Sequence, residues 1–169
     1  MALQLILVRH AGAEARHTAR WPDDRKRPLS PHGRQKFTRA AAGLGRWLPQ
    51  VDAVFTSPLT RARQTSKILE KVAGWPAAQV SVALLPYRGA TAVFALLGQH
   101  PDQRVALIGH EPGLSRLLAA CLIGAGARPI AEFRKGGVAL LGFAAEPQAG
   151  KADLLAFVPP RALRRMGKK

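Results

Sequence analysis

Near its beginning the chain reads Leu3-Gln4-Leu5-Ile6-Leu7-Val8-Arg9-His10, a short apolar run that stops at a cation and a histidine. A strand in the middle of a parallel sheet is covered on both faces, so its sequence is almost continuously apolar, as this run is. Comparable runs recur along the chain, and each is short enough to be a strand. We therefore expect strands at residues 3–8, 53–56, 80–84, 105–108, 138–143 and 154–158.

Segments with helical periodicity separate these runs. Ser30-Pro31 and Ser57-Pro58 each place a helix-capping residue before a proline that suits the first helical position. The expected helices cover residues 31–48, 58–73, 90–99 and 112–123. Alternating strands and helices predict an α/β fold, here a three-layer α/β/α sandwich with a mostly parallel central sheet. The long segment 11–29 is expected to be a functional or mobile loop.

The composition indicates one folded domain, which we place at residues 1–169. Apolar residues make up 47% of the chain, enough for a sizeable core, which excludes a disordered basic tail. The single cysteine, Cys121, excludes an intrachain disulfide and any two-cysteine metal or redox motif. Its apolar neighbours predict a position in the core.

The apolar runs also bear on where the protein works. None approaches the roughly 20 residues that are needed to cross a bilayer. The positive charge of Arg9 follows the first apolar run, whereas a secretory signal carries its charge before the run. We therefore expect a cytoplasmic protein that has no membrane partner.

The chain is strongly basic, with 26 Lys and Arg against 10 Asp and Glu and a formal net charge of +16. The excess lies toward both ends, because residues 76–127 hold only 3 cations and 2 acids. Nucleic acid or a smaller anionic substrate would complement this charge, and a solvated basic surface is a third explanation. Only 6% of the residues are aromatic and no nucleic-acid motif occurs, so nucleic-acid binding is the outside alternative.

Polar residues follow three of the expected strands. Ligands of parallel sheets bind at the carboxyl ends of the strands, so we expect Arg9-His10, the segment 57–61 and Gly109-His110 to converge. Arginine presents a planar fork of donors that suits phosphate, and histidine can act as nucleophile or as acid and base. The five histidines show no metal-ligand spacing and no carboxylate cluster accompanies them, so no metal is expected.

Three segments of the chain resemble the signatures of the histidine phosphatase superfamily, which is phosphoglycerate mutase-like. They occur in the order that the family has, and the short chain looks like the SixA-type phosphohistidine phosphatases. The three segments read Leu7-Val8-Arg9-His10-Ala11, Thr56-Ser57-Pro58-Leu59-Thr60-Arg61-Ala62-Arg63-Gln64-Thr65 and Gly109-His110-Glu111-Pro112-Gly113. The segment Arg27-Pro28-Leu29-Ser30-Pro31-His32-Gly33 is similar to that branch too. The resemblance covers essentially the whole chain and implies a phosphoglycerate mutase-like fold.

The resemblance also implies a site and a mechanism. His10 falls on the family's nucleophile, and Arg9, Arg61 and His110 fall on its phosphate pocket; Ser57, close in sequence to Arg61, is a further candidate contact to phosphate. Neutral His10 would attack phosphorus in line, and water would hydrolyse the resulting phosphohistidine to release inorganic phosphate. The arginines and a protonated His110 would supply positive charge that a metal supplies in other enzymes, so no cofactor is implied.

One departure from the family narrows the substrate. Many members carry a glutamate after the third strand as general acid, whereas this chain reads Leu84-Leu85-Pro86-Tyr87-Arg88-Gly89 there. An alkoxide leaving group needs a proton from an acid, but imidazole, with an unperturbed pKa of about 6.5, can leave neutral or already protonated at nitrogen. We therefore expect phosphohistidine on a protein as substrate, with a small phosphate ester or a polyphosphate as the alternative. In this chain, the residues that could still supply a proton to the leaving group are Glu14, Glu111 and Tyr87.

Overall fold

The computed structural model describes residues 3–101 and 103–168, and its centre is a six-stranded sheet. The strands lie in the order β3-β2-β4-β1-β5-β6. The first four strands along the chain run parallel, and β5 is antiparallel to its neighbours β1 and β6. The strands are β1 (Leu3–Arg9), β2 (Ala53–Thr56), β3 (Gln79–Val80), β4 (Arg104–Gly109), β5 (Val138–Phe143) and β6 (Ala152–Val158).

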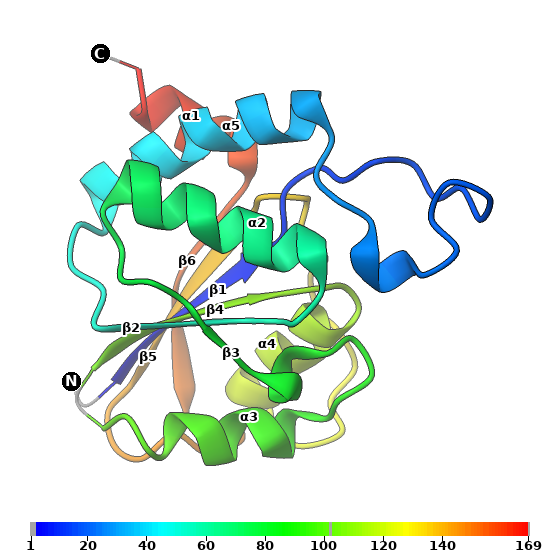
Figure 1. The fold of residues 1–169 in the computed structure, drawn as a ribbon. Helices are drawn as coiled ribbons and strands as arrows, with labels where there is room; N and C mark the ends of the chain where they lie inside the picture. Colours follow the sequence, from blue (N-terminus) through cyan, green and yellow to red (C-terminus); the bar gives the residue numbers. More distant parts are fainter. Residues whose placement is uncertain (1–2, 102, 169) are drawn as a thin grey trace.

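Helices cover both faces of this sheet (Figure 1). One face carries α1 (Pro31–Trp47), α2 (Thr60–Ile68) and α5 (Pro160–Met166), and the other carries α3 (Ala90–Leu97) and α4 (Gly113–Leu122). The predicted three-layer α/β/α sandwich with a mostly parallel sheet is therefore confirmed. No helix of the described residues is long and apolar enough to span a membrane.

Two apolar cores hold the layers together, and β1 contributes to both. Leu5 and Leu7 belong to the core under α3 and α4, whereas Ile6 and Val8 belong to the core under α1, α2 and α5. This alternation follows from the strand's two-residue period. Because all four side chains are fully buried, β1 is fixed from both sides, and the residues that follow it are held in place.

The predicted start of α1 is confirmed, but the predicted start of α2 is wrong. Ser30 caps α1, since its Oγ accepts a hydrogen bond from the backbone N–H of Gly33 at 3.0 Å. The backbone N–H of Ser57 instead donates to the carbonyl of Ile108 at 3.0 Å, so Ser57 still belongs to the sheet edge. The helix therefore begins at Thr60, with Leu59 in the cap position and no side-chain cap.

The expected strand at 80–84 is also wrong. Strand β3 has two residues, and the chain then forms one 3-10 turn over Val82–Leu84. Ser81 starts this turn, because its Oγ accepts a hydrogen bond from the N–H of Ala83 at 3.3 Å. Val80 and Val82 are 55% and 60% exposed, so the apolar run is not buried as a sheet strand would be.

The register of the central strands brings the predicted site segments together. Arg9 lies opposite Gly109, and Thr56 lies opposite Ile108. The N–H of His10 then donates to the carbonyl of Gly109 at 3.0 Å. Residues 10–30 leave the sheet as a long loop, seen at the right of Figure 1, and return to α1. All three segments therefore meet at one edge of the sheet, beneath this loop.

Candidate active site

A cavity of about 450 Å³ lies where β1 and β4 end. Four of the five predicted site residues line it. Arg9 ends β1 and His10 follows it, Arg61 lies in the first turn of α2, and His110 follows β4. The fifth, Ser57, is fully buried beside the cavity without lining it.

His10 is held in one orientation and one tautomer. Its Nδ1 lies 2.7 Å from the carbonyl oxygen of Ala11. A carbonyl only accepts hydrogen bonds, so Nδ1 carries the proton and Nε2 keeps a free lone pair. Burial, together with the nearby charges of Arg61 and Arg9, lowers the pKa of His10 to about 3, although the Ala11 hydrogen bond acts in the opposite direction. His10 is therefore a neutral base at pH 7.

His110 lies directly against His10, with ring centroids 5.0 Å apart and ring planes tilted by 52°. Both ring nitrogens of His110 are buried, and neither has a hydrogen-bond partner within the described residues. Burial, together with the electrostatic effects of His10, Arg61 and Arg9, lowers the pKa of His110 to about 3. The expectation of a protonated His110 therefore fails for the protein by itself. A phosphate dianion beside the ring would raise this pKa again, because it stabilises the cation.

Arg9 joins the cavity to the segment before β5. Its guanidinium donates to the carbonyl of Phe133 and lies 3.6 Å from the Glu132 carboxylate. Its Nε is buried and has no partner among the described residues. The N–H of Gly136 donates to the carbonyls of both Arg9 and His10, at 3.1 and 3.2 Å. Gly136 has a φ of +79°, which glycine adopts without strain.

Arg61 is the second buried arginine, and it is already paired with an acid. Its Nη1 donates to the backbone carbonyl of Asp24 at 2.9 Å and lies 3.3 Å from the Asp24 carboxylate. The same carboxylate accepts a 2.7 Å hydrogen bond from Nε of Arg27. These arginines lower the pKa of Asp24, Arg27 most strongly. The carboxylate of Asp24 therefore lies between the guanidinium groups of Arg61 and Arg27.

Ser57 is placed differently from the other four. Its Oγ accepts a 3.4 Å hydrogen bond from the N–H of Leu59, which fixes the turn before α2. The hydroxyl is buried and does not line the cavity. A direct contact between Ser57 and phosphate stays a prediction.

Sequence reasoning did not single out several cations and one acid of the cavity. Arg16, Arg27 and Asp24 reach it from the long loop, and Lys135 reaches it from the segment before β5. None of them directly follows a parallel strand, so the rule that located Arg9 and His110 could not find them. The one local feature of the sequence that could have indicated any of these residues is Arg27-Pro28, which precedes the Ser30 cap of α1.

The carboxylates that line the cavity already have partners. Glu111 accepts hydrogen bonds from the Ser115 hydroxyl at 2.6 Å and from the N–H of Phe133 at 2.9 Å. The Glu14 carboxylate lies 3.9 Å from Arg20, and Asp24 is held by arginines. Tyr87 is 77% exposed at the cavity mouth. No group of three or more His, Cys, Asp or Glu side chains within the described residues has metal-ligand geometry.

The fold and the cavity define the class: a phosphoglycerate mutase-like α/β/α protein with histidines and arginines where its parallel strands end. A model of the histidine phosphatase superfamily, branch 1, matches residues 5–82. An uncharacterized protein of Picosynechococcus sp. is 33% identical over 125 residues, which are 72% of this chain and 74% of that protein. The chain belongs to the histidine phosphatase superfamily. The family expected from the sequence is thus confirmed.

Two solved structures show the extent of the likeness. The protein histidine phosphatase SixA, complexed with tungstate, matches with a TM-score of 0.81 at 24% identity over 95% of this chain and 99% of that one. A phosphoserine phosphatase mutant of Entamoeba histolytica in complex with phosphoserine matches with a TM-score of 0.68 at 15% identity over 94% and 98%. At such identities the likeness establishes the shared fold, and it leaves the substrate open.

Proposed function

We propose that the protein is a phosphatase that hydrolyses phosphohistidine on a protein substrate and uses His10 as nucleophile. The observation that carries the proposal is the state of His10, whose Nδ1 proton is held by the Ala11 carbonyl so that Nε2 faces the reaction as a neutral base. The likeness to the protein histidine phosphatase SixA supports the choice of substrate. Membership of a phosphatase family supports the type of reaction.

The first chemical step transfers the phosphoryl group to His10. The Nε2 lone pair attacks phosphorus, and the bond between phosphorus and the substrate's imidazole nitrogen breaks. When the other nitrogen of that imidazole is protonated, the leaving group departs as neutral imidazole. The Nδ1 proton of His10 stays on the ring, and its hydrogen bond to the Ala11 carbonyl stabilises the positive charge of the phosphorylated His10. Water then attacks phosphorus, which releases inorganic phosphate and restores His10.

The cations of the cavity hold the phosphoryl oxygens during both steps. Arg9 and Arg61 each have a buried Nε without a partner among the described residues, and His110 has two such nitrogens. All three residues line the same cavity, and donors held in a buried site stabilise the charge that develops in the transition state. Chelators are expected to leave turnover unchanged, since these groups supply the positive charge. The proposal also includes a direct contact between Ser57 and the phosphoryl oxygens.

The carboxylates argue for a nitrogen leaving group over an alkoxide. Glu111, Glu14 and Asp24 line the cavity, but each is engaged by a hydrogen bond or a cation. For Asp24, the hydrogen bond from Arg27 and the charge of Arg61 lower the pKa of the carboxyl, so it carries no proton to donate. Cleavage of a phosphate ester needs that proton more than cleavage of phosphohistidine does. Hydrolysis of a small phosphate ester is the second candidate, supported by the likeness to a phosphoserine phosphatase.

Comparative turnover tests this proposal. A phosphohistidine peptide, phosphoserine and phosphotyrosine peptides, and small phosphate esters are offered at equal concentration, and released phosphate is measured. We expect the phosphohistidine peptide to have the highest kcat/KM. Faster hydrolysis of an ester would identify the second candidate as the function.

Two variants test the nucleophile. His10→Ala should lose at least about 1000-fold in kcat, because the covalent route is closed. His17→Ala removes an exposed histidine that does not line the cavity, and it should retain full activity. Quenching in alkaline detergent during turnover, which preserves the acid-labile N–P bond, should trap phosphate on the wild-type chain and not on His10→Ala. Undiminished activity in His10→Ala would refute the mechanism.

A further inference from the structure

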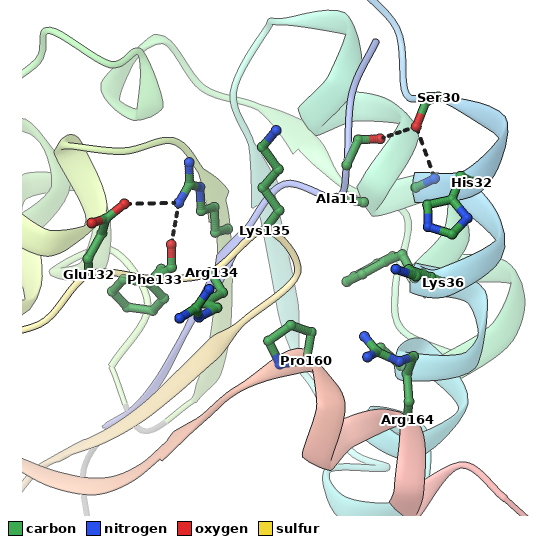
Figure 2. Close-up of a pocket in the computed structure, with 15 residues that line it drawn as sticks. Ala11, Ser30, His32, Lys36, Glu132, Phe133, Arg134, Lys135, Pro160 and Arg164 are labelled. Atoms are coloured by element: carbon green, nitrogen blue, oxygen red, sulfur yellow. Dashed lines mark hydrogen bonds and ion pairs between the residues drawn. The ribbon is translucent and has the colours of Figure 1, made fainter. Parts of the chain in front are cut away.

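A second depression of about 610 Å³ opens beside the catalytic cavity (Figure 2). It lies between the start of α1, the segment 132–135 and the first turns of α5, and we call it the basic groove. Arg9 and Lys135 line both the groove and the cavity, so the two are continuous. Phe37 and Pro160 contribute apolar surface to the groove.

Four cationic side chains dominate the groove. Figure 2 shows Lys36 of α1 and Arg164 of α5 on one side, opposite Arg134 and Lys135. Within the described part of the chain, none of these four side chains forms a hydrogen bond or an ion pair. The groove's one acid, Glu132, is 3.6 Å from Arg9. The groove thus has a large unbalanced positive charge next to the phosphate-binding residues.

The positive surface extends away from the cavity. Arg164 also lines a further depression between α1 and α5, together with Arg39, Arg161, Arg165 and Lys168. An extended strip of like charge suits an extended anion better than a compact one.

We propose that the basic groove binds an acidic segment of the substrate protein while the phosphohistidine enters the catalytic cavity. This inference rests on the proposed function and names the feature of the substrate that the enzyme recognises. Lys36, Arg134 and Lys135 are exposed, whereas sites for small ligands fix their ligand with a few precisely placed polar groups. Exposed cations on flexible stems attract a polyanionic chain over a distance and raise its association rate. The apolar surface of Phe37 and Pro160 accommodates the aliphatic parts of such a segment.

Three probes and two double variants test the docking role. The probes are a phosphohistidine peptide flanked by Asp and Glu, the same peptide flanked by Ser and Gln, and free phosphohistidine. The first variant, Lys36→Glu with Arg164→Glu, reverses charge in the groove without touching the cavity lining. The control, Lys71→Glu with Lys151→Glu, makes the same change of net charge at exposed positions elsewhere.

We expect wild type to favour the acidic peptide by about tenfold in kcat/KM at low salt, mainly through KM, and to lose this preference as salt rises. The groove variant should lose the preference and keep its turnover of free phosphohistidine. The control variant should keep both. Equal rates on the two peptides in wild type, or a preference that survives in the groove variant, would overturn the inference.

Failure of the proposed function has a different signature. In that case wild type hydrolyses a small phosphate ester faster than any of the three phosphohistidine probes, or hydrolyses none of these probes. Binding of the unphosphorylated acidic peptide, followed by fluorescence anisotropy, then still tests the groove. Wild type should bind this peptide at least about tenfold more tightly than the groove variant does. Equal binding would overturn the groove assignment by itself.

Discussion

The two histidines of the cavity are neutral because of where they lie. His10 and His110 are 6% and 3% exposed, their rings contact each other, and Arg9 and Arg61 line the same cavity. A second positive charge in this space would be costly, so each ring holds its lone pair at pH 7. A free nucleophile and a strongly attractive phosphate site therefore coexist without a separate base.

This neutrality makes a prediction for stability against pH. A histidine whose folded pKa is about 3 and whose unfolded pKa is about 6.5 binds its proton in the unfolded state first. Its contribution is complete above pH 6.5 and is lost as the pH falls toward 3. Urea unfolding at pH 6, 5 and 4 should show that His110→Gln loses less stability per pH unit than wild type, by up to about 1.4 kcal/mol. Equal slopes for the two proteins would contradict the assigned pKa.

Asp24 makes a second prediction at the same scale. Its carboxylate lies 3.3 Å from Nη1 of Arg61, so it competes with phosphate for that guanidinium. Asp24→Asn should tighten the binding of inorganic phosphate by about two- to fivefold, as measured by titration calorimetry, because a partly exposed ion pair is worth up to about 1 kcal/mol.

An acid far from the cavity provides the control for Asp24. Glu70 pairs with Lys67 at 2.8 Å, and neither residue lines the cavity. Glu70→Gln should therefore leave phosphate affinity unchanged. Weaker binding in Asp24→Asn would show that its main role is to position Arg61 and Arg27.

Among the elements, the junction of the long loop with α1 is the most tightly constrained. A Cβ at Gly33 would lie 1.9 Å from the carbonyl oxygen of Gly12, which is two residues after His10. Gly33→Ala must therefore push the loop away from α1. We expect a loss of about 1–3 kcal/mol in the free energy of unfolding, together with a fall in kcat, because His10 moves with the loop.

Gly98→Ala is the matched control for that substitution. Its new Cβ would meet ordinary contacts at 3.5 and 3.8 Å, at an exposed position outside the catalytic cavity. Stability within about 0.5 kcal/mol of wild type and full activity are expected. A Gly33→Ala protein as stable and active as this control would refute the close approach.

The elements that sequence predicted well are those set by local burial. The run at 105–108 became Arg104–Gly109, since residues buried on both faces leave a clear local pattern. Ser57 misled because its backbone N–H still bonds to the sheet, and the strand expected at 80–84 failed because the Ser81 side chain starts a 3-10 turn; neither contact can be derived from the sequence. The helix α5 was not predicted, as Leu163 is its one buried residue.

The same distinction applies to the site. Arg9, His10 and His110 were predictable because they follow parallel strands that share an edge. Asp24 and Lys135 were not, because their positions depend on distant contacts. The loop segment that carries Asp24 is held by the Arg27 guanidinium, which donates to the Glu14 carbonyl at 2.7 Å. The segment that carries Lys135 is held by the N–H of Gly136, which donates to the backbone carbonyls of Arg9 and His10.

For the whole molecule, the net charge of +16 destabilises the folded state, because like charges repel one another in the compact protein. Added NaCl screens this repulsion, so the melting temperature should rise between 0.05 and 0.5 M salt. The Lys36→Glu and Arg164→Glu double variant has a net charge that is lower by four units, and its melting temperature should rise less. A melting temperature that falls with salt would mean that ion pairs dominate the balance.

The strand order has a consequence for how the molecule is made. Strand β4 lies between β1 and β2, although it is synthesised after both. A nascent chain that ends before residue 104 lacks β4 and the His110 that follows it. Strands β1 and β2, which precede the segments carrying Arg9-His10 and Arg61, then lack the strand that pairs with both of them. Insertion of β4 is a long-range event, which is slow and closes the fold cooperatively. Enzyme activity should therefore return during refolding only with the final global phase, and no truncated fragment should be active.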